Sequence, residues 1–265
     1  MTEAGEATYQ LVRSVGLGAA LLSLLVLERW RPHERLRPAW GTNLGLWGVD
    51  ALVMAAICGA CGFAVASWAE GQRLGLAVWV GASGWVATGI GVLGLDAVSY
   101  AWHRANHQVP LLWRFHQVHH ADASFHVTTA LRFHPGELIL ALPVRLAFIL
   151  LLGVPPAGVL VFELVFGVAN LVEHGNVELP RRIDLSLRRL LITPALHRAH
   201  HVADWRELNT NFGTVFSFWD RLAGTFRESE PGRRVTTGLP DRRESAPPTL
   251  PESLLLPFTQ RRERP

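Results

Sequence analysis

The sequence predicts an all-α, polytopic membrane protein with about three spans, a short helical hairpin and a cytoplasmic helical unit rich in histidine. Long apolar tracts alternate with polar, arginine-rich stretches, and the mean hydropathy of the 265 residues is positive, at +0.20. This alternation is typical of chains that cross a bilayer several times. In addition, histidines recur three and four residues apart, a spacing that places side chains on one face of a helix.

Arginine alone carries the positive charge of the chain. All 25 basic residues are arginine, against 22 acidic residues, and the isoelectric point is about 9.5. Such a basic surface serves either nucleic-acid binding or contact with anionic lipid headgroups. Because the arginines gather in the loops and the tail between apolar tracts, we interpret the surface as membrane-facing and expect no nucleic-acid partner.

Residues 11–27 form the first expected span. The loop that follows them carries Arg29, Arg31, Arg35 and Arg37. Positively charged loops remain in the cytoplasm, so this loop is expected inside and the N-terminus outside. The residues before the span lack a basic segment followed by a cleavage site, and the tract is therefore expected to be a retained anchor.

Residues 43–69 form the second expected span, whose many glycines and alanines allow close contact between helices. Cys58 and Cys61 have the CxxC spacing of redox and zinc motifs. They stand inside an apolar tract without a second pair, so we interpret them as small packing residues and expect no disulfide. The connector at residues 70–75 carries little net charge and is expected outside.

The third expected helix, residues 76–107, carries the first two histidines of the pattern. No proline interrupts the chain there before Pro110. Its 32 residues would extend about 48 Å, whereas the hydrocarbon core of a bilayer is roughly 30 Å thick. The helix is therefore expected to leave the bilayer on the cytoplasmic side, at the end that bears His103 and His107.

The next segments return to the membrane once and end again on the cytoplasmic side. Residues 111–137 are too polar to span and are expected as a helix and loop near the interface. Two short apolar tracts, residues 138–152 and 156–172, flank a Gly-Val-Pro-Pro turn and predict a tight helical hairpin whose end returns to the cytoplasm. His174 follows this end directly.

The rest of the chain adds a further histidine helix and a polar tail. Thr193 is a suitable N-cap, and Pro194 suits the first position of a helix. We expect three regions: N-terminal transmembrane helices at residues 1–94, the histidine-rich unit at 95–226, and a polar, weakly ordered tail at 227–265.

Eight histidines fall into three groups that each share a helical face. A lone histidine is usually an ordinary polar side chain, and His33 fits that interpretation. Burying eight imidazoles without partners would be costly, whereas neutral imidazole is a good ligand for Zn, Cu, Fe and Ni. The groups are His103 and His107; His116, His119 and His120; and His197, His200 and His201.

The number of imidazoles favours two metal ions. The HxxxH group lacks the carboxylate that zinc hydrolases place beside their ligands, and a structural zinc site closes with four ligands. Together with His174, which stands alone between the groups, there are nine histidines. They suffice for two metal ions with four or five ligands each.

Seven motifs follow one another through the histidine-rich unit. In chain order they are DAVSYAWHRANH, WRFHQVHH, TTALRFHPGE, EHGNV, TPALHRAHH, NTNFG and FWDRLAGTF, and they cover about residues 95–226. In this order they resemble the fatty acid hydroxylase/sterol desaturase superfamily, membrane di-iron oxygenases with HxxxH, HxxHH and HxxHH boxes. The resemblance implies that residues 95–226 are a di-iron catalytic domain and that the preceding spans anchor this domain in the membrane.

The resemblance also implies a reaction. It implies two non-haem iron ions, O2 as co-substrate and electrons from an external donor, cytochrome b5-like or ferredoxin-like with a reductase. The expected reaction is hydroxylation or desaturation of a C–H bond in a membrane lipid. Sterols, fatty acyl chains, carotenoids and ether lipids all remain open as substrates.

We predict that nine histidines are both iron ligands and catalytic residues. His134 is a further candidate, interpreted as a supporting or structural residue, and His126 is not expected to be a ligand. Ligand histidines usually donate their second N–H to a carboxylate or a carbonyl. The nine are His103, His107, His116, His119, His120, His174, His197, His200 and His201. The carboxylates near them are Asp96, Asp122, Glu137, Glu173 and Asp204, most of them interpreted as ordinary solvated or capping residues.

Two other classes of protein remain open at this point. A membrane metal transporter or metal-binding protein would use the histidines as transit ligands, and it would place ionisable residues at mid-membrane. A haem electron carrier needs only one or two axial histidines and would leave the others unexplained. We prefer the oxygenase because the boxes lie at or beyond the ends of the expected spans.

Overall fold

The computed structural model describes residues 3–58, 60–242 and 247–259, and it is built from helices. Within these ranges there is no β-strand, only two isolated bridges. The predicted all-α class is therefore confirmed. The helices are α1 Glu3–Trp30, α2 Trp40–Ile57, α3 Cys61–Gly71, α4 Leu76–Trp79, α5 Gly84–Gln108, α6 Pro110–His120, η1 Val127–Leu131, α7 Pro135–Leu152, α8 Pro156–Glu173, α9 Arg181–Leu187, α10 Pro194–His200, α11 Trp205–Leu208, α12 Phe218–Leu222, η2 Pro240–Arg242 and α13 Leu250–Thr259.

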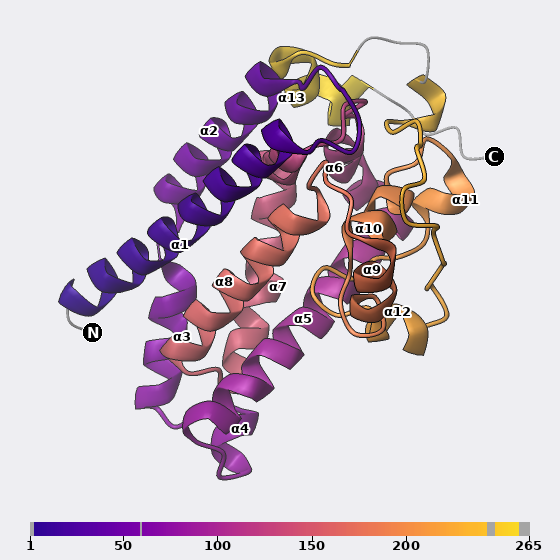
Figure 1. Cartoon of the computed structure of the whole chain (residues 1–265). Coiled ribbons are helices and arrows are strands. Elements are labelled where there is room, and N and C mark those ends of the chain that lie inside the picture. Colours follow the sequence, from indigo (N-terminus) through magenta and orange to yellow (C-terminus); the bar gives the residue numbers. More distant parts are fainter. Residues whose placement is uncertain (1–2, 59, 243–246, 260–265) are drawn as a thin grey trace.

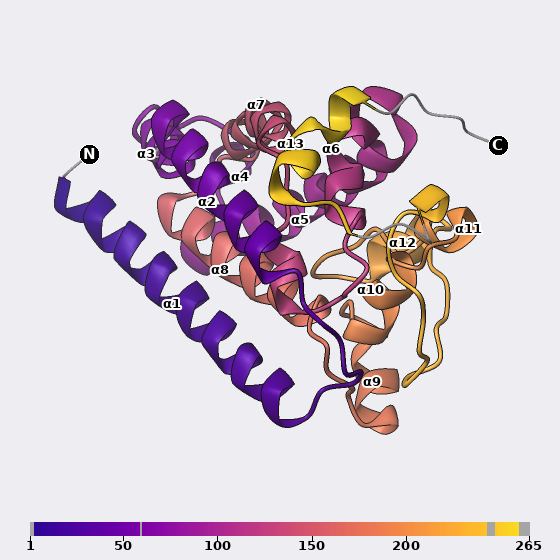
Figure 2. The same ribbon diagram turned by 90° about the horizontal axis from the view of Figure 1, so that it is seen from above.

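Long helices form a bundle, and most of the short ones gather at one end of it (Figures 1 and 2). The helix α8 contacts α1, α3 and α5, so it occupies the middle of the bundle. Buried side chains from five helices meet there in one core cluster, which includes Tyr9 of α1, Ala66 of α3, Leu95 of α5, Ile149 of α7 and Phe162 of α8. This arrangement holds the C-terminal ends of α5 and α8 beside α6 and α10.

Among the described residues, four segments are long and apolar enough to cross a membrane: Ala4–Trp30, Trp40–Trp79, Pro135–Leu152 and Pro156–Glu173. Only 6% to 28% of each apolar stretch is buried within the protein. The apolar side chains therefore face outward, which in water would be an unusually large exposed patch and in a bilayer is the expected contact with lipid. The chain is an integral membrane protein.

The second expected span is divided into α2 and α3. A disulfide joins Cys58 to Cys61 at the break. The expectation of one continuous helix with two unpaired packing cysteines is therefore wrong. Cys58 leaves the helical conformation, with φ −144°, and α3 begins at Cys61, so the pair stands at a turn and not inside a helix.

The third expected helix is also interrupted. α4 ends at Trp79, and Gly81 and Gly84 adopt positive φ angles of 70° and 52° on the two sides of the gap before α5. Residues with a side chain rarely adopt such angles, so these glycines permit a break between α4 and α5. The expectation of a continuous helix rested on the absence of proline and did not consider the glycines. The 25 residues of α5 still extend about 38 Å.

The predicted hairpin is present as α7 and α8, but its two arms are held by other helices. Both α3 and α5 pack against α7 and against α8. Gly153 ends α7 in the left-handed conformation, with φ 65°. A Cβ atom at Gly75 would lie 2.2 Å from the Gly153 nitrogen, so a close approach of two glycines fixes this turn against the start of α4.

Part of the tail is built into the fold. α13 packs against α2 and α6, and its Leu256 is buried together with Leu46 and Trp113. Residues 250–259 therefore do not show the weak order expected for residues 227–265. The tail is polar on average, but it contains this short apolar helix.

The arginine-rich loop after α1 lies at the histidine end of the bundle. The backbone N–H of His33 donates to the carbonyl of Asn176, 2.9 Å away. The Asn176 N–H in turn donates to the carboxylate of Glu28 at the end of α1. Because Asn176 follows His174 by two residues, the loop and the histidine helices belong to the same face of the molecule.

Candidate metal centre

The C-terminal parts of α5 and α6 supply five histidines. His103 and His107 are one turn apart near the C-terminus of α5. α6 follows after one residue and carries His116, His119 and His120 in its second half. α5 and α6 pack against each other, so the two sets face a common space.

The other four histidines come from α8 and α10. His174 is the C-cap of α8. His197 and His200 lie in α10, and His201 is its C-cap; Pro194 is the first residue of this helix, as predicted. α8 packs against α10, which brings the isolated histidine of the sequence next to the last box.

All nine predicted ligands meet in two adjoining groups. Within each group, one ligand atom of every residue lies within 4.8 Å of those of the others. The division into five and four agrees with the number of ligands expected for each of two metal ions. The larger group is His103, His107, His116, His120 and His200, and the smaller is His119, His174, His197 and His201.

Hydrogen bonds fix the tautomers of two rings in the larger group. His103 places Nδ1 2.8 Å from the carbonyl oxygen of Phe212, and His200 places Nδ1 2.7 Å from that of Thr210. A carbonyl oxygen only accepts, so each Nδ1 carries the proton and each Nε2 is a lone pair. These two Nε2 atoms face each other at 3.1 Å. Neither can donate to the other, whereas a cation between them would satisfy both.

The smaller group repeats the same arrangement. The Nδ1 atoms of His119 and His174 lie 3.2 Å and 2.7 Å from the carbonyl oxygens of Arg132 and Asn170. Their Nε2 atoms are 3.1 Å apart. Each group thus contains one pair of Nε2 lone pairs that point at each other. This set of imidazole donors fits two metal ions, one in each group.

Burial keeps the rings neutral. Desolvation lowers the pKa of His174 to about 4 and that of His200 to about 3. The pKa values of His119, His197 and His201 lie well below the usual range for the same reason, with neighbouring imidazoles adding to the effect. Neutral rings at physiological pH leave the lone pairs available for coordination.

Two buried carboxylates lie beside ligand rings. His116 donates from Nδ1 to Glu137 Oε1 at 2.8 Å, and Asn106 donates to the same oxygen at 3.0 Å. Glu173 places Oε2 3.6 Å from His197 Nδ1. A carboxylate in this position orients the ring and makes it a stronger donor. Glu137 and Glu173 thus have the supporting position considered from the sequence.

The other three carboxylates stabilise the surrounding structure. Asp96 accepts from the indole of Trp219 at 2.9 Å. Asp122 accepts from Asn43 at 2.9 Å, and Asp204 caps α11. Asp204 is thus a capping residue, as expected, whereas Asp96 and Asp122 are buried and not solvated.

His134 and His126 stand apart from both histidine groups. His134 accepts from the N–H of Gly136 at 2.9 Å and places Nε2 3.1 Å from the carbonyl of Leu254. His126 caps η1 by accepting from the N–H of Thr128. Both rings thus serve as helix caps, and the structural interpretation of His134 is supported by its two contacts.

The structure adds residues that the sequence did not single out. Asp220 accepts the N–H groups of Phe212 and Gly213, both at 2.8 Å, and so holds the segment whose carbonyl binds His103. Arg132 is fully buried beneath α6. Each lies within one of the motifs quoted from the sequence, FWDRLAGTF for Asp220 and TTALRFHPGE for Arg132, and that position is the signal that could have indicated it.

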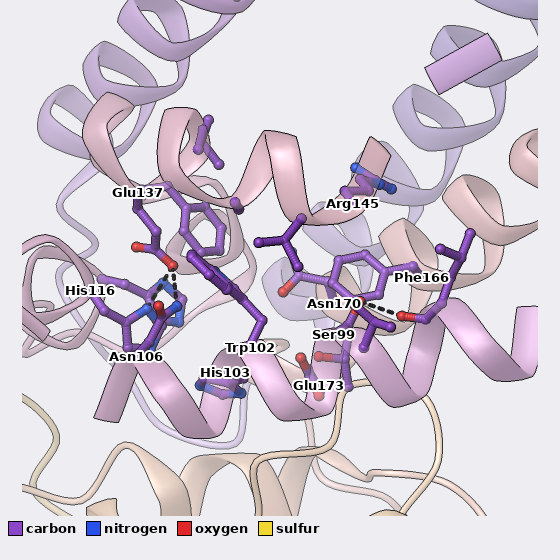
Figure 3. Close-up of a pocket in the computed structure, with 18 of the residues that line it drawn as sticks. Ser99, Trp102, His103, Asn106, His116, Glu137, Arg145, Phe166, Asn170 and Glu173 are labelled. Atoms are coloured by element: carbon purple, nitrogen blue, oxygen red, sulfur yellow. Dashed lines mark hydrogen bonds and ion pairs between the residues drawn. The ribbon is translucent and has the colours of Figure 1, made fainter. Parts of the chain in front are cut away.

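A cavity of about 230 Å³ adjoins the histidines between α5, α7 and α8. Figure 3 shows Glu137 and His116 at one end of it, Arg145 and Phe166 at the other, and Trp102 between. Leu95, Val98, Leu138, Val144 and Phe162 are among the apolar side chains of its walls. The cavity therefore offers an apolar ligand direct access to the histidine centre.

Comparison with known families decides the membership of the chain. A sequence model described as fatty acid hydroxylase matches residues 88–225, more than half of the chain, and the match contains all nine histidines. The chain belongs to the fatty acid hydroxylase family. The predicted resemblance to the fatty acid hydroxylase/sterol desaturase superfamily is thus confirmed.

Several curated proteins are similar to about half of the chain. Ornithine lipid hydroxylase OlsE of Rhizobium tropici is 36% identical over 138 residues, 51% of this chain and 41% of the relative. Human alkylglycerol monooxygenase is 32% identical over 152 residues, 56% and 32% of the two chains. Rat cholesterol 25-hydroxylase is 29% identical over 149 residues, 56% and 49% of the two chains. The matched region is thus less than half of each relative, and no solved structure matches the chain significantly.

Proposed function

We propose that this fatty acid hydroxylase family member is a membrane di-iron oxygenase that uses O2 and external electrons to hydroxylate a lipid. The observation that carries the proposal is the division of nine buried imidazoles into groups of five and four beside an apolar cavity. The names of the relatives, ornithine lipid hydroxylase, alkylglycerol monooxygenase and cholesterol 25-hydroxylase, favour hydroxylation over desaturation.

The nine histidines are the proposed ligands, one iron for each group. Bound iron would supply the activation of O2 that attack on an unactivated C–H bond requires. The chain supplies neutral Nε2 donors whose direction is fixed by backbone carbonyls, and Glu137 holds His116 in the same way. Imidazole is a suitable ligand for iron, and these outer contacts set the ring orientation on which the metal site depends.

The cavity favours a membrane lipid over a soluble metabolite. Its walls are mainly apolar, and α7 and α8, which form two of them, are long and apolar enough to cross a membrane. An alkyl chain that enters from lipid avoids a hydration cost of about 0.8 kcal/mol per CH2. The enclosing helices also exclude water from the reacting carbon, which suppresses competing reactions.

The cytoplasmic face is the proposed location of the centre. The arginine-rich loop at residues 29–37 lies at the histidine end of the bundle, and such loops remain on the cytoplasmic side. A cytoplasmic centre would receive electrons there from a separate donor, cytochrome b5-like or ferredoxin-like with a reductase.

A metal transporter is not favoured by the distribution of candidate ligands. In the described part of the chain, groups of residues able to hold a metal ion occur only at this centre. A transport path would place further ligand groups along the spans.

The test is oxidation of a native lipid extract by the iron-loaded protein with 18O2 and a competent reductant. We expect 18O to appear in a lipid hydroxyl group, detected by mass spectrometry, and to be absent when the iron is removed. A new double bond in the lipid without incorporated 18O would show that the reaction is desaturation and not hydroxylation. No product from the fully loaded, reduced protein would refute the oxygenase.

A further inference from the structure

The membrane bundle contains a cluster of four ionisable residues outside the two histidine groups. We call Tyr9, Arg13, Arg145 and Glu163 the intramembrane cluster; they come from α1, α7 and α8. The Glu163 carboxylate accepts from the Tyr9 hydroxyl and, at 3.1 Å, from Arg13 Nη1. Its other oxygen lies 3.6 Å from Arg145 Nη2. Charged groups at this depth are costly and usually serve a function.

The intramembrane cluster carries an unbalanced positive charge. Arg13 and Arg145 share the single carboxylate of Glu163, so two cations face one anion. In surroundings of low dielectric constant, an uncompensated charge is far more costly than a paired one. The cluster therefore favours the approach of a second anion.

Arg145 is the member of the cluster that has the free capacity to bind. At 3.6 Å, it is beyond hydrogen-bonding distance of Glu163, and none of the described residues accepts a hydrogen bond from it. Its guanidinium lies 5.3 Å from the centre of the Phe162 ring, and 40% of its side chain is exposed. Arg13, by contrast, is hydrogen-bonded to Glu163.

Arg145 also lines the cavity that leads to the histidines, whereas Tyr9, Arg13 and Glu163 do not. Figure 3 places it at the end opposite His116. Arg145 stands eight positions after Glu137, the partner of His116, along α7, a rise of about 12 Å. An anionic group at Arg145 would thus leave a stretch of apolar cavity for the chain attached to it.

We propose that Arg145 binds the anionic head of the lipid substrate, a carboxylate or a phosphate, and directs the alkyl chain toward the histidines. Guanidinium is suited to both anions because its planar fork donates two parallel, charge-assisted hydrogen bonds. The inference rests on the proposed function for the identity of the substrate site. It adds that the anionic head is held away from the metal centre, so the oxidised carbon lies in the alkyl chain.

Photolabelling of the iron-free protein in nanodiscs tests this binding without catalysis. The probes are palmitate with a diazirine at its terminal carbon, hexadecanol with the same group, and a phosphatidic acid whose acyl chain carries it. We expect one of the acidic probes to label cavity residues near the histidines more strongly than hexadecanol does. Arg145→Gln should reduce this labelling about ten-fold or more, the loss of a charge-assisted hydrogen bond, and leave hexadecanol labelling unchanged.

Two matched variants separate binding from a structural role. Arg145→Lys keeps the charge and should retain much of the preference for the acid. Arg13→Gln removes no residue of the cavity but leaves Glu163 to Arg145 alone. Because the excess positive charge is then lost, this variant should weaken labelling by the acid less than Arg145→Gln does, and leave labelling by hexadecanol unchanged. Unchanged hexadecanol labelling in Arg145→Gln shows that the cavity is intact.

The acidic probe that depends on Arg145 identifies the head group as carboxylate or phosphate. The proposal is overturned if neither acid is preferred over the alcohol, or if Arg145→Gln weakens the acid and the alcohol equally. The labelling uses iron-free protein and so does not depend on catalysis. A failed oxygenase assay together with Arg145-dependent labelling would therefore refute the proposed function and leave anion binding by Arg145 in place.

Discussion

At four histidines, a backbone carbonyl decides which ring nitrogen faces the metal centre. The Nδ1 atoms of His103, His119, His174 and His200 all meet carbonyl oxygens. Side-chain substitution cannot remove a carbonyl, so the tautomers depend on the backbone of α8 and of the segments after α10 and after η1. The centre is therefore sensitive to the local backbone as well as to its ligands.

Replacing one histidine from each group should deplete bound iron. We expect His119→Ala and His200→Ala to lose about half or more of the iron, because each removes an inward-facing donor from one group. His33→Ala is the control, because His33 lies in the loop after α1, contacts Glu178 and belongs to neither group. Metal analysis of the purified variants gives the measurement. Full iron content in His119→Ala and His200→Ala would contradict the ligand assignment.

At the scale of the element, helical periodicity predicted the positions of the histidines but not the interruptions of the helices. Spacings of three and four residues put the histidines of α5, α6 and α10 on shared faces, and the structure brings them together. The breaks before Cys61 and Gly84 depend on a disulfide and on glycine φ angles, which no hydropathy pattern reports. Arg132 contacts Asn43 and Ser253, which are distant in sequence, and Asp220 holds the segment whose Phe212 carbonyl binds the distant His103, so both roles required the fold.

Arg132 joins three elements beneath the metal centre, and its loss should destabilise the protein. It donates to the Val118 carbonyl of α6 at 2.8 Å, to Asn43 of α2 at 2.9 Å and to Ser253 of α13 at 3.1 Å. Arg132→Leu would leave buried acceptors unsatisfied, each at a cost of about 1–3 kcal/mol.

We therefore expect a clearly lower melting temperature for iron-free Arg132→Leu in detergent, measured by intrinsic fluorescence. Arg182→Leu is the control because Arg182 is exposed on α9. Equal melting temperatures for the two variants would show that the buried contacts of Arg132 contribute little to stability.

At the scale of the whole molecule, the bundle separates a polar, histidine-bearing end from an end made of short turns. The arginine-rich loop and the short helices around the centre share the first end, while the α3–α4 connection meets the α7–α8 turn at the second (Figure 1). The apolar outer faces between them match a bilayer. This polarity gives the chain an orientation that can be measured.

Labelling of single cysteines should reveal this orientation. Arg35→Cys places a thiol in the exposed arginine-rich loop, and Arg73→Cys places one in the exposed α3–α4 connection. Cys58 and Cys61 are paired, so background labelling of the thiols is low. Because positively charged loops stay inside, we expect a membrane-impermeant maleimide to label Arg73→Cys in intact cells and Arg35→Cys only after permeabilisation. The reverse pattern would move the metal centre to the outer face, and labelling of both in intact cells would contradict the placement of the two loops on opposite sides of the membrane.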